Sequence, residues 1–158
     1  MTVDLPLYEE ELKLLQDNLH KLHVDANAKA VFLFSKNGQQ LAAAGDVERF
    51  DTTSLASLTA GSVTADGLAK LISERQFSTL LHEGQQDHVH LSVVANDAIL
   101  AIIFDTRSSL GLVRTRANRI NGELVKIFAT SRQKSDAGTG AAEVAELTDD
   151  EIKALFAA

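Results

Sequence analysis

Apolar positions along the chain follow two patterns, spacings of three and four residues and short continuous or alternating runs. The first pattern indicates a helix with one apolar stripe, and the second indicates strands. Helical spacing predicts a first helix over residues 7–22 and a last helix over 109–132. The stripe of the first helix comprises Tyr8, Leu12, Leu15, Leu19 and Leu22. The runs predict five strands, at residues 30–34, 39–44, 77–83, 87–95 and 98–104.

The first two strands are joined by Asn37-Gly38, a dipeptide strongly preferred in tight hairpin turns. Asn96-Asp97 predicts a second tight turn between the fourth and fifth strands. Ala98–Phe104 is the most apolar run in the chain. A strand covered on both faces has this composition, so we expect it at the centre of the sheet.

Residues 51–72 predict a central helix with two apolar faces. One stripe comprises Leu58, Gly61, Ala65, Leu68 and Ile72, and the opposite stripe comprises the smaller residues Ala56, Ala60, Val63 and Gly67. A surface helix normally buries one stripe and exposes a charged face. We therefore assign the bulky stripe to the protein's own core and the small-residue stripe to a second protein. Asp51, Thr52 or Thr53 supplies the N-cap.

The element order α-β-β-α-β-β-β-α predicts an α+β fold, a five-stranded antiparallel sheet with helices on both faces. Residues 1–132 form this domain. Residues 133–147 are mostly small and polar and predict a flexible linker. Residues 148–158 predict a short amphipathic helix, with Thr148 and Glu151 spaced as a capping box. A helix this short is marginal alone in water, so we expect it to order against a partner.

Composition narrows the function classes. The chain has 158 residues, no cysteine and a net charge of −7, which argues against general nucleic-acid binding. Without cysteine there are no disulfides and no thiolate metal site. The N-terminal region carries acidic residues where a signal peptide would be basic, and no apolar run is long enough for a membrane span. These features predict a cytoplasmic protein.

No catalytic constellation stands out. His88 and His90 have a spacing that can hold a metal, but without a third ligand a polar outer face or an edge position is the better interpretation. Asp105 lies beside Arg107, a pair that can take part in acid–base chemistry. Helix capping is the better interpretation, because the pair sits where a strand passes into a helix. No glycine-rich phosphate loop occurs. We therefore expect no catalytic residue, no metal and no cofactor on this chain.

Residues 7–132 resemble the Roadblock (dynein light-chain) family. The resemblance is carried by Tyr8–Glu11, Asp25–Lys29, Asp51–Gly61, Gly67–Ile72, His82–Gly84, Ile103–Asp105 and Ser109–Arg114. Thr148–Glu151 with Leu155 and Phe156 also resemble the tail of bacterial polarity regulators in this family.

The resemblance implies a homodimer joined through the third strand, with Phe77, Thr79, Leu80, Leu81, His82 and Glu83 at the interface. It implies one small Ras-like GTPase, which carries its own nucleotide and magnesium, docked on the paired central helices of two copies. The contact residues would be Thr52, Thr53, Ala56, Thr59, Ala60, Val63, Thr64 and Gly67, with Ile152, Leu155 and Phe156 of the tail.

The resemblance also implies a function: a GTPase-activating regulator of bacterial cell polarity and motility, enriched at a cell pole, that remodels the GTPase without an arginine finger. Arg75 and Arg107 are the arginines placed where a finger could act, so that alternative stays open. A Roadblock scaffold that binds a GTPase or cytoskeletal partner without stimulating hydrolysis is the other alternative. A stand-alone enzyme is the third.

Overall fold

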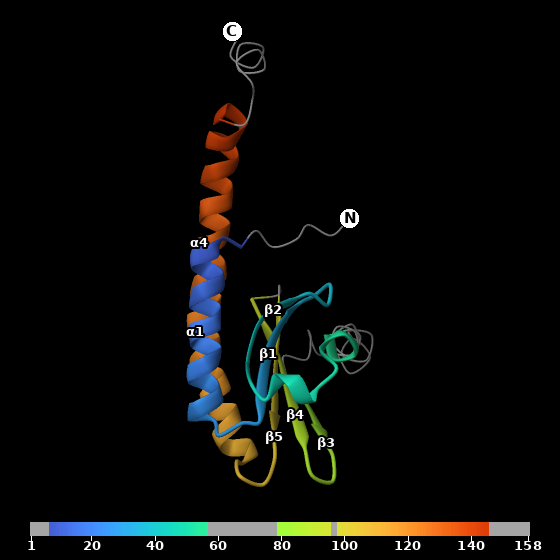
Figure 1. Ribbon diagram of the computed structural model, residues 1–158. Coiled ribbons are helices and arrows are strands. Elements are labelled where there is room, and N and C mark those ends of the chain that lie inside the picture. The colour runs from blue at the N-terminus through green and yellow to red at the C-terminus, as the bar shows by residue number, and fades with distance from the viewer. Residues whose placement is uncertain (1–6, 57–78, 96–97, 146–158) are drawn as a thin grey trace, which may run out of the picture.

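The computed structural model describes residues 7–56, 79–95 and 98–145, with side chains up to residue 134 (Figure 1). Predictions that concern residues 57–78, 96–97 and 146–158 lie outside these ranges. The described elements are α1 (Glu9–Asp25), β1 (Ala30–Ser35), β2 (Gln40–Gly45), the 3₁₀ turn η1 (Val47–Arg49), β3 (Thr79–Glu83), β4 (His88–Val94), β5 (Ala98–Phe104) and α4 (Leu110–Ala145). A further helix begins at Thr52 and is described as far as Ala56.

The five strands form one antiparallel sheet in the order β2-β1-β5-β4-β3. Helices α1 and α4 lie together along one side of it (Figure 1). The α+β fold, the element order and the central position of β5 are as the sequence predicts. The edge strands are β2 and β3.

The sheet has an apolar core on each face, which explains the continuous apolar runs of β1 and β5. Val31, Leu33, Leu100 and Ile102 point towards α1 and α4. The alternate positions of both strands, Phe32 among them, face the opposite core together with Ala56. Because successive side chains of a strand point to opposite faces, only strands covered on both sides need apolar residues at every position.

The hairpin between β1 and β2 is confirmed. The Gly38 amide donates to the Ser35 carbonyl at 3.0 Å, and Gly38 has φ of +86°, a conformation that glycine adopts without strain. The polar connection therefore reverses the chain as the Asn-Gly dipeptide indicates.

The buried stripe of α1 differs from the predicted one at its start. Tyr8 and Leu12 are 42% and 38% exposed, whereas Glu11 is 1% exposed. Glu11 precedes Leu15 by four positions and so shares its face. Its carboxylate meets Lys134 of α4 at 2.8 Å, and this ion pair offsets part of the cost of burying a charge. Apolarity alone does not reveal a buried acid with a partner far along the chain.

The predicted linker begins too early, because α4 continues as a helix to Ala145. Once a helix is nucleated, each further residue adds a hydrogen bond at little cost, so the two glycines of residues 133–145 do not end it. Lys134 fixes this region to the start of α1 through Glu10 and Glu11. The last part of α4 projects beyond α1 (Figure 1).

Candidate partner-binding surfaces

Strand β3 forms an open edge of the sheet, because in the described part of the chain it pairs with β4 alone. Leu80 and Leu81 lie half-buried on opposite faces of the strand, and each packs at the margin of one core. Thr79, His82 and Glu83 are exposed. An edge with apolar side chains on both faces and free backbone groups is a template for another strand. Phe77 lies outside the described residues.

The backbone direction of β3 identifies the groups that are free to pair. The Gly84 N–H donates to the Asp87 carbonyl at 3.0 Å just beyond the strand pair, which makes Glu83 and His88 a pair without direct hydrogen bonds. The pattern alternates, so the amides and carbonyls of Thr79, Leu81 and Glu83 point outward. Outward groups at three alternate positions are what an added strand requires.

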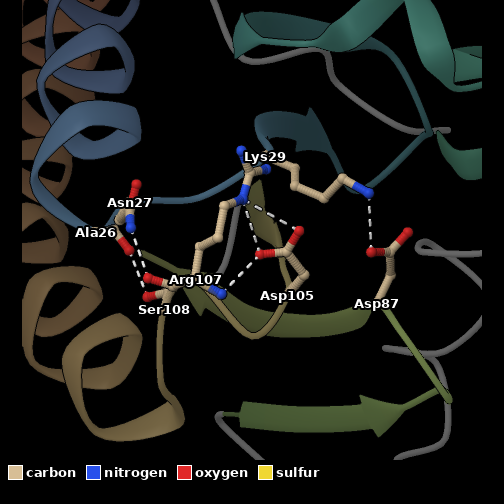
Figure 2. A network of polar contacts seen from close by, with 7 residues as sticks. All are labelled: Ala26, Asn27, Lys29, Asp87, Asp105, Arg107 and Ser108. Atoms are coloured by element: carbon tan, nitrogen blue, oxygen red, sulfur yellow. Dashed lines mark hydrogen bonds and ion pairs between the residues drawn. The ribbon is translucent and has the colours of Figure 1, made fainter.

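A polar network holds the β3–β4 hairpin against the rest of the sheet (Figure 2). The ammonium of Lys29, at the start of β1, lies 2.9 Å from a carboxylate oxygen of Asp87, in the turn before β4. The Lys29 side chain is 15% exposed, so this ion pair is partly shielded from water. The contact fixes the base of the hairpin that carries the open edge.

The same network ties the β5–α4 loop to the end of α1 (Figure 2). Ser108 donates its hydroxyl to the Ala26 carbonyl, and Asn27 donates its amide to the Arg107 carbonyl, both at 2.5 Å. Asp105 accepts from the backbone N–H of Arg107 at 2.9 Å and from its guanidinium at 3.1 Å. Both hydrogen bonds lower the pKa of Asp105, and the bond from the Arg107 backbone has the larger effect.

The structure corrects the predicted role of Asp105 as a helix cap. It caps the turn after β5, whereas Ser109 caps α4 by accepting from the Leu112 N–H at 3.1 Å. Arg107 has a side chain that is 61% exposed, although Asp105 holds its guanidinium. The contacts between Asp105 and Arg107 are those of a turn, so turn structure explains the pair.

The central helix begins as predicted, and Asp51 is its N-cap. Its carboxylate accepts from the Ser54 N–H at 3.2 Å and from the Ser54 hydroxyl at 2.8 Å. Both hydrogen bonds lower the pKa of Asp51, and the bond from the Ser54 hydroxyl has a larger effect than the bond from the Ser54 N–H. Thr53 is exposed and Thr52 is half-buried, so both can contribute to a surface at the start of this helix.

Ala56 does not face outward, which overturns its assignment to the docking stripe. It is 4% exposed and packs in the core that contains Phe32 and Phe34. Ala56 is the member of that stripe that lies among the described residues, and the assignment of Ala60, Val63 and Gly67 stays a prediction. The two predicted stripes differ in the size of their residues. Size alone does not show which stripe binds a partner, because small residues can pack as closely against the protein's own sheet as against another protein.

The remaining predicted contact residues lie outside the described residues. They are Thr59, Ala60, Val63, Thr64 and Gly67 of the central helix, Arg75 after it, and Ile152, Leu155 and Phe156 of the tail. Their roles stay predictions.

The two histidines of β4 have different surroundings. His88 packs its ring against Phe104 at a centroid distance of 5.2 Å. His90 is 2% exposed, and neither ring nitrogen has a hydrogen-bond partner among the described residues. Burial, with the nearby charge of Arg114, lowers the pKa of His90. The predicted polar outer face or edge position is therefore wrong for His90, which is buried in a strand between β5 and β3.

A cavity of about 360 Å³ lies between the edge of the sheet and the start of α4. It is lined by Leu81, Glu83, His88, Phe104, Asp105, Thr106, Ser108, Ser109 and Leu110. In the described ranges, no three histidine, aspartate, glutamate or cysteine side chains gather closely enough to hold a metal. None of the described helices is long and apolar enough to cross a membrane.

Comparison with known proteins agrees with this architecture. The sequence of residues 14–104 matches the family model of the Roadblock/LC7 domain. MglB of Myxococcus xanthus is 49% identical, with a TM-score of 0.75 over 79% of this chain and 95% of that one. The gliding protein MglB of Thermus thermophilus is 25% identical, with a TM-score of 0.76 over 82% of this chain and 99% of the other.

More distant structures share the fold. Profilin IB of Acanthamoeba castellanii is 10% identical, with a TM-score of 0.55 over 70% of this chain and 96% of that one. No curated protein gives a significant match.

Proposed function

The chain belongs to the Roadblock/LC7 domain family, and we propose that it is a homodimeric activator of a small Ras-like GTPase of the MglA type. The observation that carries this proposal is the 49% identity to Myxococcus xanthus MglB over most of both chains. In this function the protein regulates cell polarity and gliding motility from the cytoplasm, enriched at one pole. The nucleotide and its magnesium ion belong to the GTPase.

The geometry of β3 supports the dimer. A second copy that pairs antiparallel along this edge satisfies the outward backbone groups of Thr79, Leu81 and Glu83 in both chains at once. Such an interface is closed by a two-fold axis, because each copy offers the same surface. The ion pair of Lys29 with Asp87 lies within one chain, so it fixes the β3–β4 hairpin independently of the partner.

The surface at the start of the central helix supports GTPase docking. The helix begins on the sheet face opposite α1 and α4, with Thr53 exposed beside the capped terminus. Pairing through β3 brings two such helices to the same side of a continuous sheet. One GTPase on this pair would contact two copies of the chain.

Activation in this proposal proceeds without an arginine finger. Arg107 is engaged by Asp105, and it lies in the loop before α4, the helix that covers the opposite sheet face from the central helix. The activator therefore stabilises a conformation in which the GTPase's own residues complete its site, and it contributes no reacting group.

The decisive experiment is single-turnover GTP hydrolysis by an MglA-type GTPase, measured with and without this protein. We expect stimulation that saturates at two copies per GTPase. Binding without stimulation would select the scaffold function, and absence of binding would reject both.

Arg107→Ala tests the mechanism in the same assay. We expect hydrolysis within about threefold of the wild-type rate, because removal of a true finger costs roughly a thousandfold or more. Affinity is measured in parallel, so that a loss of binding is not taken for a loss of catalysis. A loss of stimulation by two orders of magnitude or more with binding intact would establish Arg107 as a finger.

A further inference from the structure

The two edges of the sheet differ in how they are protected. At β2, helix α1 runs close to the strand, and Gln16 reaches from it to Ala43. The Gln16 amide nitrogen donates to the Ala43 carbonyl at 2.5 Å, and its amide oxygen accepts from the Ala43 N–H at 3.2 Å. One side chain therefore satisfies both backbone groups of one strand residue.

These backbone groups are the ones that point away from the sheet. The Asp46 N–H donates to the Lys29 carbonyl at 2.9 Å beyond the end of the strand pair, which makes Ala30 and Gly45 a pair without direct hydrogen bonds. Two residues back, Ala43 opposite Phe32 is of the same type. Its N–H and carbonyl would otherwise be free to accept a new strand.

A second side chain of α1 covers the next outward position. A Cβ atom placed on Gly45 would lie 2.6 Å from the His23 ring, so this ring sits directly against the Gly45 backbone. His23 follows Gln16 by seven residues, two turns along the same face of the helix. Consecutive outward positions of β2 are thus occupied by one helix.

We propose that Gln16 is a specificity-determining residue for assembly, which closes the β2 edge against a second copy of this chain. Its amide takes the place that the backbone of an added strand would occupy. Proteins commonly protect edge strands by covering them. With β2 closed, edge-to-edge pairing is confined to β3, and assembly stops at a closed pair instead of continuing. The proposal rests on the proposed function only in taking β3 as the edge that pairs.

Gln16→Ala tests this inference, with Asn18→Ala as its matched control. Asn18 is an amide on the same helix, but it bonds to the carbonyl of Leu14 within its own helix. Sedimentation velocity over about a hundredfold range of concentration measures the species present. We expect Gln16→Ala to form species larger than the wild-type dimer as concentration rises, and Asn18→Ala to match the wild type.

Gln16→Glu separates edge exposure from general loosening of the fold. The carboxylate cannot donate to the Ala43 carbonyl, but a charge at an edge itself opposes strand pairing. We expect this variant to remain at the wild-type size. Larger species in Gln16→Glu as well as Gln16→Ala would attribute association to loosening and overturn the proposal.

Amide hydrogen exchange at Ala43 gives a second readout. At concentrations where Gln16→Ala is still unassembled, exchange at Ala43 should rise by roughly tenfold over the wild type, the effect of losing one hydrogen bond. Unchanged mass in Gln16→Ala at every concentration would also overturn the proposal. A monomeric wild type would reject pairing through β3, and larger species in Gln16→Ala alone would still support the role of Gln16.

Discussion

At the scale of single residues, His90 is a titratable side chain in a buried position, without hydrogen bonds to its ring nitrogens among the described residues. It lies in the α4-side face of β4, between Leu81 and Ile102 of the neighbouring strands, with Arg114 of α4 nearby. Because its folded-state pKa is lowered, the unfolded chain takes up a proton before the folded protein does. Stability is therefore unaffected well above the ordinary histidine pKa of about 6.5 and falls as the pH drops below it.

His90→Leu should remove this dependence. Each pH unit between the two pKa values costs the wild type up to about 1.4 kcal/mol of unfolding free energy, and leucine has no proton to take up. Denaturant unfolding between about pH 7.5 and about pH 5 measures the difference. His20→Gln, at an exposed histidine of α1, is the matched control for the substitution itself. Parallel profiles for His90→Leu and the wild type would show that His90 is not responsible.

At the scale of elements, the edge strand β3 gives the sharpest test of the dimer. Leu81→Pro removes an outward-facing N–H without breaking a bond to β4, and Leu81→Ala removes the same apolar side chain but keeps the N–H. We expect the dimer of Leu81→Pro to dissociate at least about tenfold more readily than that of Leu81→Ala, since a backbone bond is lost in each copy. Equal dissociation constants would place the interface elsewhere.

The central helix yields a second prediction at this scale. From the burial of Ala56 and helical spacing we predict that Ala60 lies on the sheet side of the central helix and that Ala65, nine positions after Ala56, lies on its outer side. Ala65→Arg should then weaken GTPase binding about tenfold or more with thermal stability retained, because an arginine would be buried unpaired against the partner. Ala60→Arg should chiefly lower the melting temperature. The reverse pattern would restore the small-residue stripe as the docking surface.

These elements also show what sequence can and cannot predict. Periodicity identifies β1, β5 and the described helices because burial on one or two faces leaves a direct apolar pattern. It misses contacts that join distant segments, such as Glu11 with Lys134 and Gln16 with Ala43. It also cannot tell which of two apolar stripes a helix buries. The assignment of Ala56 is wrong for that reason, and the rest of the predicted docking stripe stays a prediction.

At the scale of the whole molecule, α4 decides where the tail begins. Its 36 residues form a rod of about 54 Å, and the tail after Ala145 starts at the far end of that rod. Residues 146–158 then reach at most about 45 Å from that point. Because the starting point of the tail is set by the end of α4, its effective concentration at a bound GTPase would depend on how far that GTPase lies from Ala145.

Two truncations separate the tail from the helix that carries it. Removal of residues 146–158 should leave the dimer intact and alter GTPase affinity or stimulation severalfold, because it deletes the apolar stripe of Ile152, Leu155 and Phe156. Removal of everything after Lys134 should have the same effect and little more, since it retains the ion pairs with Glu10 and Glu11. If only the longer deletion changed affinity or stimulation, the projecting part of α4 would carry the contact and the tail would have no role in it.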